Sequence, residues 1–243
     1  MPLIIKAAIV REQLRRSSAH PSKMLAPHST LRLGSWVAAD HVLHAQEPLI
    51  HHMPQSIAFV NGKGGTGKST LCLMIATVLQ LHKQRVRVDD RDPQGNSTAA
   101  AQQSGIPTEG EADFVLIDTC PDIERPSTLA AIREADLVVI VTRPEFFDVA
   151  STLATAQVVQ RERPADARTC VVFNQVRPQT LVAKEMLDTK SRIPFPVLSM
   201  MLPQRAAYSR ANRFGWNTLT PKERVEVLEL SIQVLDLLSG SRV

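Results

Sequence analysis

The sequence predicts an α/β fold in which helices cover both faces of a doubly wound, mostly parallel sheet. Short apolar runs, such as residues 57–60 and 137–141, have the length and unbroken hydrophobicity of strands buried on both faces. Segments with helical periodicity alternate with these runs, as in strand–helix–strand units. A glycine-rich turn, residues 62–67, joins the first of these strands to the first helix. We assign residues 54–243 to this one domain.

The composition is that of an ordinary globular protein. Of 243 residues, 44% are hydrophobic and 21% are charged, and the formal net charge is +4. No apolar run approaches the roughly 20 residues that a membrane-spanning helix needs. The three cysteines, Cys72, Cys120 and Cys170, show no metal-ligand or C-x-x-C spacing, so we expect reduced thiols in the core.

The glycine-rich turn carries a phosphate-binding motif. Residues 62–69 match G-x-x-x-x-G-K-[ST], and a helical pattern at 71–80 follows. The backbone amides of such a loop converge on phosphate oxygens, and the helix N-terminus adds its dipole. Lys68 is placed to reach the β- and γ-phosphates, and the Ser69 hydroxyl to ligate Mg²⁺. The predicted nucleotide-binding residues are Gly62, Lys63, Gly64, Gly65, Thr66, Gly67, Lys68, Ser69 and Thr70.

Lys63 distinguishes this loop from a plain phosphate-binding loop, which needs no lysine there. From Lys63 to Ser69 the chain reads K-G-G-T-G-K-S and resembles the deviant Walker A motif of the ParA/MinD family of partition and positioning ATPases. The resemblance implies a P-loop NTPase of the deviant Walker A type, with ATP and Mg²⁺ as cofactors and a homodimer formed with ATP. It also implies that Lys63 reaches the nucleotide held by the other subunit, and that Lys63 and Lys68 act in catalysis.

An acidic segment follows the next predicted strand, residues 85–88. Residues 90–96 read D-R-D-P-Q-G-N and resemble the family's first switch segment, D-x-D-P-Q-G-N. The resemblance implies that Asp92 positions the attacking water and lies near Mg²⁺, with Asp90 in support. The structural alternative is a turn that closes a strand.

A second acidic site ends the apolar run 112–118. A strand buried on both faces would deliver Asp118 to the Mg²⁺ coordination shell, which is the Walker B pattern. Residues 118–121 resemble the family's second switch, D-T-x-P. The segment between the two switches is shorter than the family usually has, and residues 97–111 offer at most one short helix and a loop.

The remaining pattern continues the alternation of strands and helices. We predict a helix at 127–134 with Ser127 as its N-cap, a helix at 148–160 and a buried strand at 170–174. By resemblance, Asn174 at the end of that strand would recognise the adenine edge. An Asn in this place is otherwise a turn residue.

The C-terminal third is basic between residues 177 and 215. In partition ATPases this part binds DNA without sequence preference, and phosphate contact requires no base reading. The alternative is a solvated surface. By resemblance the DNA-binding candidates are Lys190, Arg192, Arg205, Arg210 and Arg213.

A closing helix is predicted at 221–238, with Thr220 as its cap. Its acidic residues favour docking onto the domain over the basic membrane-binding helix of MinD-type proteins. The predicted buried stripe is Val225, Leu228, Ile232, Leu235 and Leu238.

Residues 1–53 differ from the rest of the chain. Six of the seven histidines lie here without metal-site spacing, and the Arg- and Ser-rich composition superficially matches a transit peptide. We interpret this segment as a flexible extension, or as sequence read from a start codon placed too early. By resemblance, small family members begin near Met53.

The resemblance favours a bacterial ParA-type ATPase of plasmid or chromosome partition. It would be cytoplasmic and nucleoid-associated, it would bind DNA non-specifically as an ATP dimer, and a ParB-like centromere-binding partner would stimulate hydrolysis. No membrane partner is expected. Three alternatives stay open: a MinD-like positioning or regulatory ATPase without DNA binding, a metabolic P-loop enzyme such as a small ATP-dependent ligase, and a nucleotide-binding remnant without hydrolysis.

Overall fold

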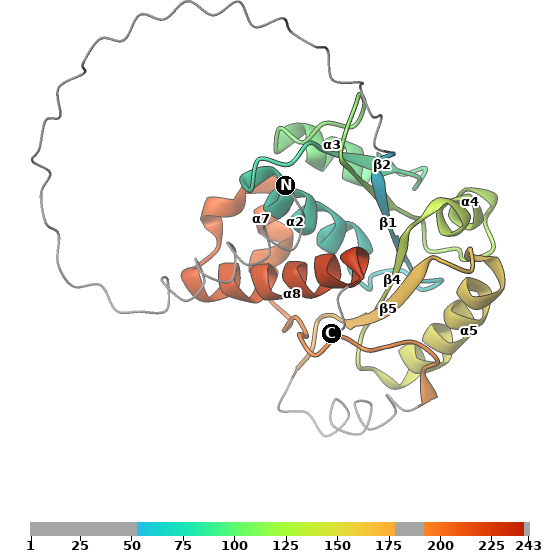
Figure 1. Cartoon of the computed structure of the whole chain (residues 1–243). Helices are drawn as coiled ribbons and strands as arrows, with labels where there is room; N and C mark the ends of the chain where they lie inside the picture. Colours follow the sequence, from blue (N-terminus) through green and yellow to red (C-terminus); the bar gives the residue numbers. More distant parts are fainter. Residues whose placement is uncertain (1–52, 178–191, 241–243) are drawn as a thin grey trace, which may run out of the picture.

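A computed structural model describes residues 53–177 and 192–240, without the side chains of residues 146, 147 and 149. Within these ranges the strands form one parallel sheet in the order β2-β3-β1-β4-β5 (Figure 1). The predicted doubly wound, parallel sheet is therefore confirmed, whereas the predicted extension at 1–52 lies outside the described residues. The strands are β1 Gln55–Val60, β2 Val86–Asp90, β3 Phe114–Asp118, β4 Leu137–Thr142 and β5 Arg168–Phe173.

Helices cover both faces of the sheet. Helices α2, α7 and α8 lie on one face, and α4 and α5 on the other (Figure 1). A short 3₁₀ helix, η2 Trp216–Thr218, joins α7 to α8. The α-helices are α2 Lys68–Leu81, α3 Asn96–Gln103, α4 Pro126–Glu134, α5 Phe146–Glu162, α7 Ala206–Phe214 and α8 Pro221–Ser239.

The central strands feed two separate cores by strict alternation. In β1, Ile57 and Phe59 join the apolar cluster under α2, α7 and α8. Ala58 and Val60 join the second cluster, under α4 and α5. All residues of β4 are buried, as the unbroken apolar run predicted.

Helix α2 is buried on more than one face. The helix predicted at 71–80 is present, and its buried residues include Leu71, Ile75, Val78 and Leu79 as well as Cys72, Met74 and Ala76. The reason is that α2 lies between the sheet and helices α7 and α8, where a helix is apolar nearly all round. The start of this helix, which belongs to the candidate site, is thus held by core packing.

Several predicted boundaries differ from the observed ones, and two of the differences bear on the site. Ser127 is not the N-cap of α4: the cap residue is Arg125, Pro126 begins the helix, and the Ser127 hydroxyl donates to the Arg91 carbonyl at 3.4 Å. Strand β2 does not end at residue 88, because its pairing with β3 continues until Asp90 lies opposite Asp118. The two acidic residues are therefore neighbours on adjacent strands.

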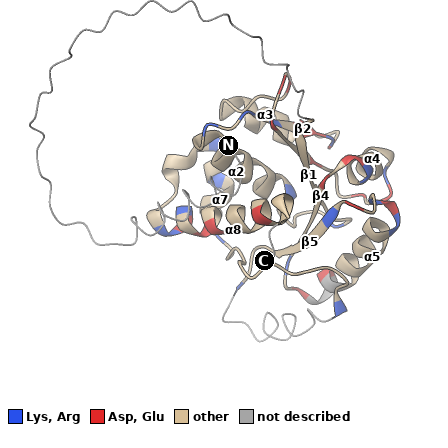
Figure 2. Cartoon of the chain, in the orientation of Figure 1, with Lys and Arg blue, Asp and Glu red and all other residues tan. Residues whose placement is uncertain are grey.

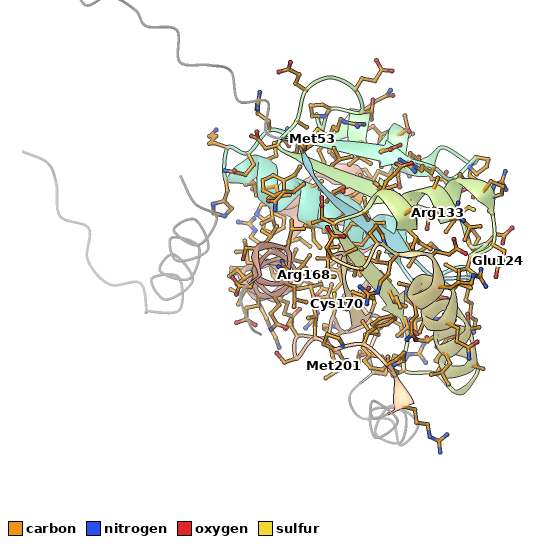
Figure 3. The ribbon with its side chains drawn as sticks, turned by 45° about the vertical axis from the view of Figure 1, so that its right-hand side comes forward. Met53, Glu124, Arg133, Arg168, Cys170 and Met201 are labelled. Carbon is orange, nitrogen blue, oxygen red and sulfur yellow. The ribbon has the colours of Figure 1, made fainter. Side chains whose placement is uncertain are left out.

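The two ends of α8 are fixed by different means. The cap predicted at Thr220 is confirmed, and the structure shows it to be a capping box: Thr220 N donates to Glu223 Oε2 at 2.8 Å, and Glu223 N donates to Thr220 Oγ1. At the other end, Arg168 of β5 donates to the carbonyls of Leu237 and Leu238, both at 2.6 Å (Figure 3).

The predicted stripe of α8 was only partly right. Ile232 and Leu238 are buried, but Val225, Leu228 and Leu235 are only half-buried. The face of α8 that packs into the core, next to α2, is formed by a different set of residues. These residues are Val227, Leu230, Val234 and Leu238.

The cysteines belong to the core. All three are free and buried, as predicted, and burial raises the pKa of Cys170 to about 12. Among the residues that the structure describes, no helix is both long and apolar enough to span a bilayer.

Replacing Leu137 by alanine should lower the free energy of unfolding by about 2–5 kcal/mol, because the change leaves a cavity in a packed core. Leu137 has no exposed surface, whereas Leu81, at the end of α2, is 51% exposed. Leu81→Ala is therefore the matched control, with an expected change of about 0.5 kcal/mol or less. Urea denaturation measures both variants, and equal losses would contradict the position of β4 in the sheet.

Candidate functional site

The candidate site lies at the carboxyl ends of the central strands, where ligands of open α/β sheets bind. The phosphate-binding loop connects β1 to α2, and Lys68, Ser69 and Thr70 form the first turn of the helix. Asp118, at the end of β3, pairs with Phe59 of β1 and with Asp90 of β2. Sheet register thus brings the predicted loop and both predicted acidic sites together.

The start of the loop is anchored by Asn61, which the sequence reasoning missed. Its side chain is buried, and its Nδ2 donates to the carbonyl of Val141 at 2.8 Å. Its Oδ1 accepts from Lys63 N at 2.9 Å, and Gly62 N donates to Thr155 Oγ1 at 3.1 Å. The backbone amides of Gly62 and Lys63 therefore already donate hydrogen bonds to protein side chains. The signal available in the sequence was a polar residue directly after an apolar strand.

The end of the loop depends on left-handed backbone. Gly65 has φ +73° and Gly67, the N-cap of α2, has φ +94°. Residues with a Cβ rarely adopt this region. The amides of the first helical turn have no partner within the helix, so they are open to an anion.

Two carboxamides that follow β5 hold the outer side of the loop. Asn174 Nδ2 donates to the Thr66 carbonyl at 2.8 Å, and Gln175 Nε2 donates to the Gly65 carbonyl at 2.9 Å. The resemblance predicted that Asn174 recognises the adenine base, and in the structure its side-chain amide nitrogen donates to the loop. Gln175 was not predicted. A cavity of about 260 Å³ begins beside them, and its lining includes Thr70, Pro203, Gln204 and Tyr208.

Asp118 is a buried carboxylate with one oxygen unsatisfied. Its Oδ2 accepts from the Ser97 hydroxyl, and its Oδ1 has no hydrogen-bond partner among the residues that the structure describes. Burial raises the pKa of Asp118, while the nearby hydroxyls of Ser69 and Ser97 and the charge of Lys68 oppose the rise. Burial lowers the pKa of Lys68, and the charges of Asp118 and Asp92 oppose the fall.

These groups fit a magnesium ion that also binds phosphates. An unpaired carboxylate oxygen beside a serine hydroxyl is the hard-oxygen donor set that Mg²⁺ prefers. Over residues 53–177 and 192–240, no group of three or more His, Cys, Asp or Glu side chains could hold a metal alone. Water and a nucleotide would therefore have to complete the coordination shell.

The first switch segment is a tight turn built on Asp90. Both its carboxylate oxygens accept backbone amides, from Asp92 at 3.1 Å and from Thr98 at 2.7 Å. The Asp92 carboxylate accepts from Gln94 N at 3.1 Å through Oδ1. Asp90 thus holds the turn and the start of α3, and Asp92 is the carboxylate that this turn presents near Lys68.

Lys63 forms an ion pair within its own subunit. Its Nζ pairs with Asp148 in the first turn of α5, a residue with no exposed surface. Arg143 Nε donates to the other oxygen of Asp148 at 2.7 Å. The sequence reasoning missed both partners. Asp148 is the common anion of two cations, and Lys63 is the more exposed of them.

The predicted DNA-binding residues do not share one setting. Lys190 lies outside the described residues, and Arg192 is exposed. Arg205 donates to the Glu226 carboxylate through two bonds of 2.8 and 3.1 Å, so its charge is largely neutralised by a residue of the same domain. Arg210 and Arg213 are exposed on α7, and Figure 2 colours basic residues blue in the region of α7 and α8.

An exposed aromatic ring accompanies these basic residues. The Arg213 guanidinium lies 5.2 Å from the ring centroid of Phe214, which is 63% exposed. A cation beside an exposed ring suits the backbone and bases of a nucleic acid.

Comparison with known proteins identifies the family. The model of the CobQ/CobB/MinD/ParA nucleotide-binding domain matches residues 57–218, which include the loop, both switches and α7. The chain belongs to this family. Maintenance of carboxysome distribution protein A of Halothiobacillus neapolitanus is 27% identical over 179 residues, which cover 64% of this chain and 82% of that protein.

Solved structures agree with this family. A plasmid partition protein of Borrelia burgdorferi B31 bound to AMPPNP superposes with a TM-score of 0.59 at 18% identity, covering 74% of this chain and 99% of that chain. Cobyrinic acid a,c-diamide synthase of Mycobacterium smegmatis, with bound ADP and magnesium, superposes with a TM-score of 0.57 at 19% identity. The match covers 76% of this chain and 95% of that chain. At these identities the similarity shows the shared fold.

Gly67→Ala should abolish nucleotide binding. A Cβ at this position would lie 2.1 Å from Asn174 Nδ2, so the loop would have to move. Gly105→Ala is the matched control, because Gly105 also has positive φ (+67°) but no atom within 4 Å of its added Cβ. The control should lose roughly 1–2 kcal/mol of stability and keep its affinity. Calorimetric titration with ATP measures both, and full binding by Gly67→Ala would contradict the loop geometry.

Proposed function

We propose that this protein is a ParA-type, Mg²⁺-dependent ATPase of the bacterial cytoplasm that positions a cargo on nucleoid DNA, with plasmid or chromosome partition as its first candidate role. The observation that carries the proposal is the phosphate-binding loop, which has two lysines, a buried and unpaired acidic oxygen beside it, and a preformed backbone. AMPPNP in the Borrelia protein and ADP with magnesium in the synthase support ATP and Mg²⁺ as ligands.

The chain offers a place for each part of Mg·ATP. The phosphates would lie on the loop amides and Lys68, and the base in the cavity beside Asn174. Ser69 and Asp118 would hold the metal, with Asp92 close by, and the metal would neutralise charge on the β- and γ-phosphates. Ser97 would keep Asp118 oriented, because it already donates to the other carboxylate oxygen.

Asp92 is the residue that we assign to the attacking water. Hydrolysis transfers the γ-phosphoryl group to water, which needs an acceptor for its hydrogen bond or proton. The Asp90 carboxylate is committed to backbone amides, so it supports the turn and leaves this role to Asp92.

Asp92→Asn should lower ATP turnover by about 100-fold or more, the usual contribution of a positioned base, with little change in ATP affinity. Asp122→Asn is the matched control, because Asp122 is exposed and also accepts the amide two residues on, at 3.1 Å. Phosphate release under saturating ATP measures both variants. An undiminished rate in Asp92→Asn would remove Asp92 from this role.

We propose that Lys63 reaches the nucleotide of a second subunit and so makes the dimer depend on ATP. In the single chain the lysine is paired with Asp148, and it would have to leave that partner. Arg143 would stay on Asp148, so the buried carboxylate would not be left without a cation. This exchange is consistent with slow hydrolysis until a ParB-like or other cargo-bound partner assembles with the dimer.

The DNA proposal predicts retention of duplex DNA with ATP and not with ADP or without nucleotide, and retention that weakens with salt. Arg210→Ala/Arg213→Ala should lower the slope of log K against log salt by about two for each subunit that contacts the DNA, one for each lost phosphate contact. Lys63→Ala should lose retention because it loses the dimer.

The control removes two arginines elsewhere, in Arg85→Ala/Arg133→Ala, and it should leave retention unchanged. Arg85 precedes β2, and Arg133 lies on α4, on the sheet face opposite α7. Sedimentation with ATP reports the dimer independently of DNA. Failure to retain DNA in any nucleotide state would reject the DNA role.

A positioning ATPase for a protein cargo, without DNA, is the second candidate. The similarity to the carboxysome distribution protein favours it, and so does the pairing of Arg205 with Glu226, which leaves less free charge in the basic region. An ATP-dependent dimer that retains no DNA would support this candidate over partition.

A further inference from the structure

The two carboxamides after β5 bond consecutive peptide units of the phosphate-binding loop. Gln175 holds the Gly65 carbonyl at 2.9 Å, and Asn174 holds the Thr66 carbonyl at 2.8 Å. The two contacts join segments more than 100 positions apart in the sequence. They therefore tie the loop to a strand that is separated from β1 by β4.

Peptide geometry converts these contacts into an orientation of the loop amides. A peptide unit is planar, and in the trans form its C=O and N–H point in opposite directions. The structure has no cis peptide in its described ranges. The Gly65 carbonyl shares its unit with the Thr66 amide, and the Thr66 carbonyl with the Gly67 amide. Holding both carbonyls outward turns both amides toward the concave side of the loop, where an anion binds.

The backbone after β5 is bent so that both side chains can reach the loop. In an extended strand, successive side chains point to opposite faces. Gln175 has φ +55°, one of the two non-glycine residues with positive φ among those described. Such backbone is strained for a residue with a Cβ and persists only where its surroundings enforce it. Here Asn174 N donates to the Thr142 carbonyl at 2.7 Å, and Val176 N to the Leu202 carbonyl at 2.9 Å.

The fit between Asn174 and the loop leaves no spare room. Asn174 is 4% exposed, and its Nδ2 occupies the space that a Cβ on Gly67 would need. Asn174 is one of the residues that line the cavity, but its amide nitrogen is bonded to the loop. A residue that only contacted a base would not need this bond to the Thr66 carbonyl.

We propose that Asn174 and Gln175 are positioning residues for the polyphosphate: they hold two loop carbonyls outward and so aim the Thr66 and Gly67 amides at the phosphates. The inference rests on the proposed binding of Mg·ATP at this loop. It gives Asn174 a role in phosphate recognition, where the family resemblance predicted recognition of the adenine edge.

The test compares ATP with inorganic tripolyphosphate, which has the phosphates and no base. Asn174→Ala and Gln175→Met remove the donors, and Gln175→Met keeps the length of the side chain. Each variant should bind both ligands about tenfold more weakly in the presence of Mg²⁺, because each loses one hydrogen bond and the amide orientation that it holds. Calorimetric titration measures all four affinities.

The control is Gln80→Ala. Gln80 is another half-buried glutamine whose Nε2 donates to a backbone carbonyl, that of Gly105 at 2.7 Å, away from the loop. Its removal should leave both affinities unchanged. Melting curves of the three variants show whether each is folded, and Gln175→Met, which is not in the core, keeps the test open if Asn174→Ala fails to fold.

The outcomes separate the possibilities. A loss confined to ATP in Asn174→Ala would assign this residue to the base and overturn the proposal. Unchanged binding of both ligands by folded variants would overturn it too. If the unaltered protein bound neither ATP nor tripolyphosphate, the proposed function would fail, and that failure is distinct from the failure of the two positioning residues.

Discussion

An anion site made of backbone amides depends on the hydrogen bonds that hold the opposite side of the same peptides. The loop between β1 and α2 is held in its conformation at three places. Asn61 ties down its start, Asn174 and Gln175 its outer carbonyls, and the packed helix α2 its end. The side chains of Asn61, Asn174 and Gln175 do not have to touch a phosphate. Together they keep the amides converged before a ligand arrives, so binding need not order the loop.

Charge in the site is arranged so that a bound nucleotide completes it. Lys68 and Asp118 are both buried, and burial shifts the pKa of each toward its neutral form. Phosphates would favour the charged lysine, and a cation would favour the charged carboxylate. The unpaired, buried oxygen of Asp118 therefore destabilises the free protein, and a bound cation would remove this penalty. Lys63 differs, because it already has a partner in Asp148 and must exchange one ion pair for another.

The parts of the structure that follow from local sequence were predicted, and the contacts between distant segments were not. Apolar runs revealed the buried strands, the spacing from Gly62 to Ser69 revealed the loop, and Thr220 with Pro221 revealed the start of α8. The N-cap at Ser127 was wrong because Pro126 begins that helix, and the end of β2 was wrong because pairing with β3 extends it.

The supporting residues of the site could not be read from spacing. Asn61, Ser97, Asp148 and Gln175 act on partners between 20 and more than 100 positions away, and sheet register decides those contacts. Arg205 shows the reverse error: its charge suggested a DNA contact, but in the folded chain it forms an ion pair with Glu226 of α8. Charge alone does not tell which cations remain available.

A crystal structure with Mg²⁺ and AMPPNP would test the preformed loop most directly. The account predicts triphosphate on the amides from Thr66 to Ser69, a metal ion on Ser69 and Asp118, and the bonds from Asn174 and Gln175 to the loop carbonyls unchanged. A loop that refolds around the triphosphate, with these two carboxamides released from Gly65 and Thr66, would contradict it.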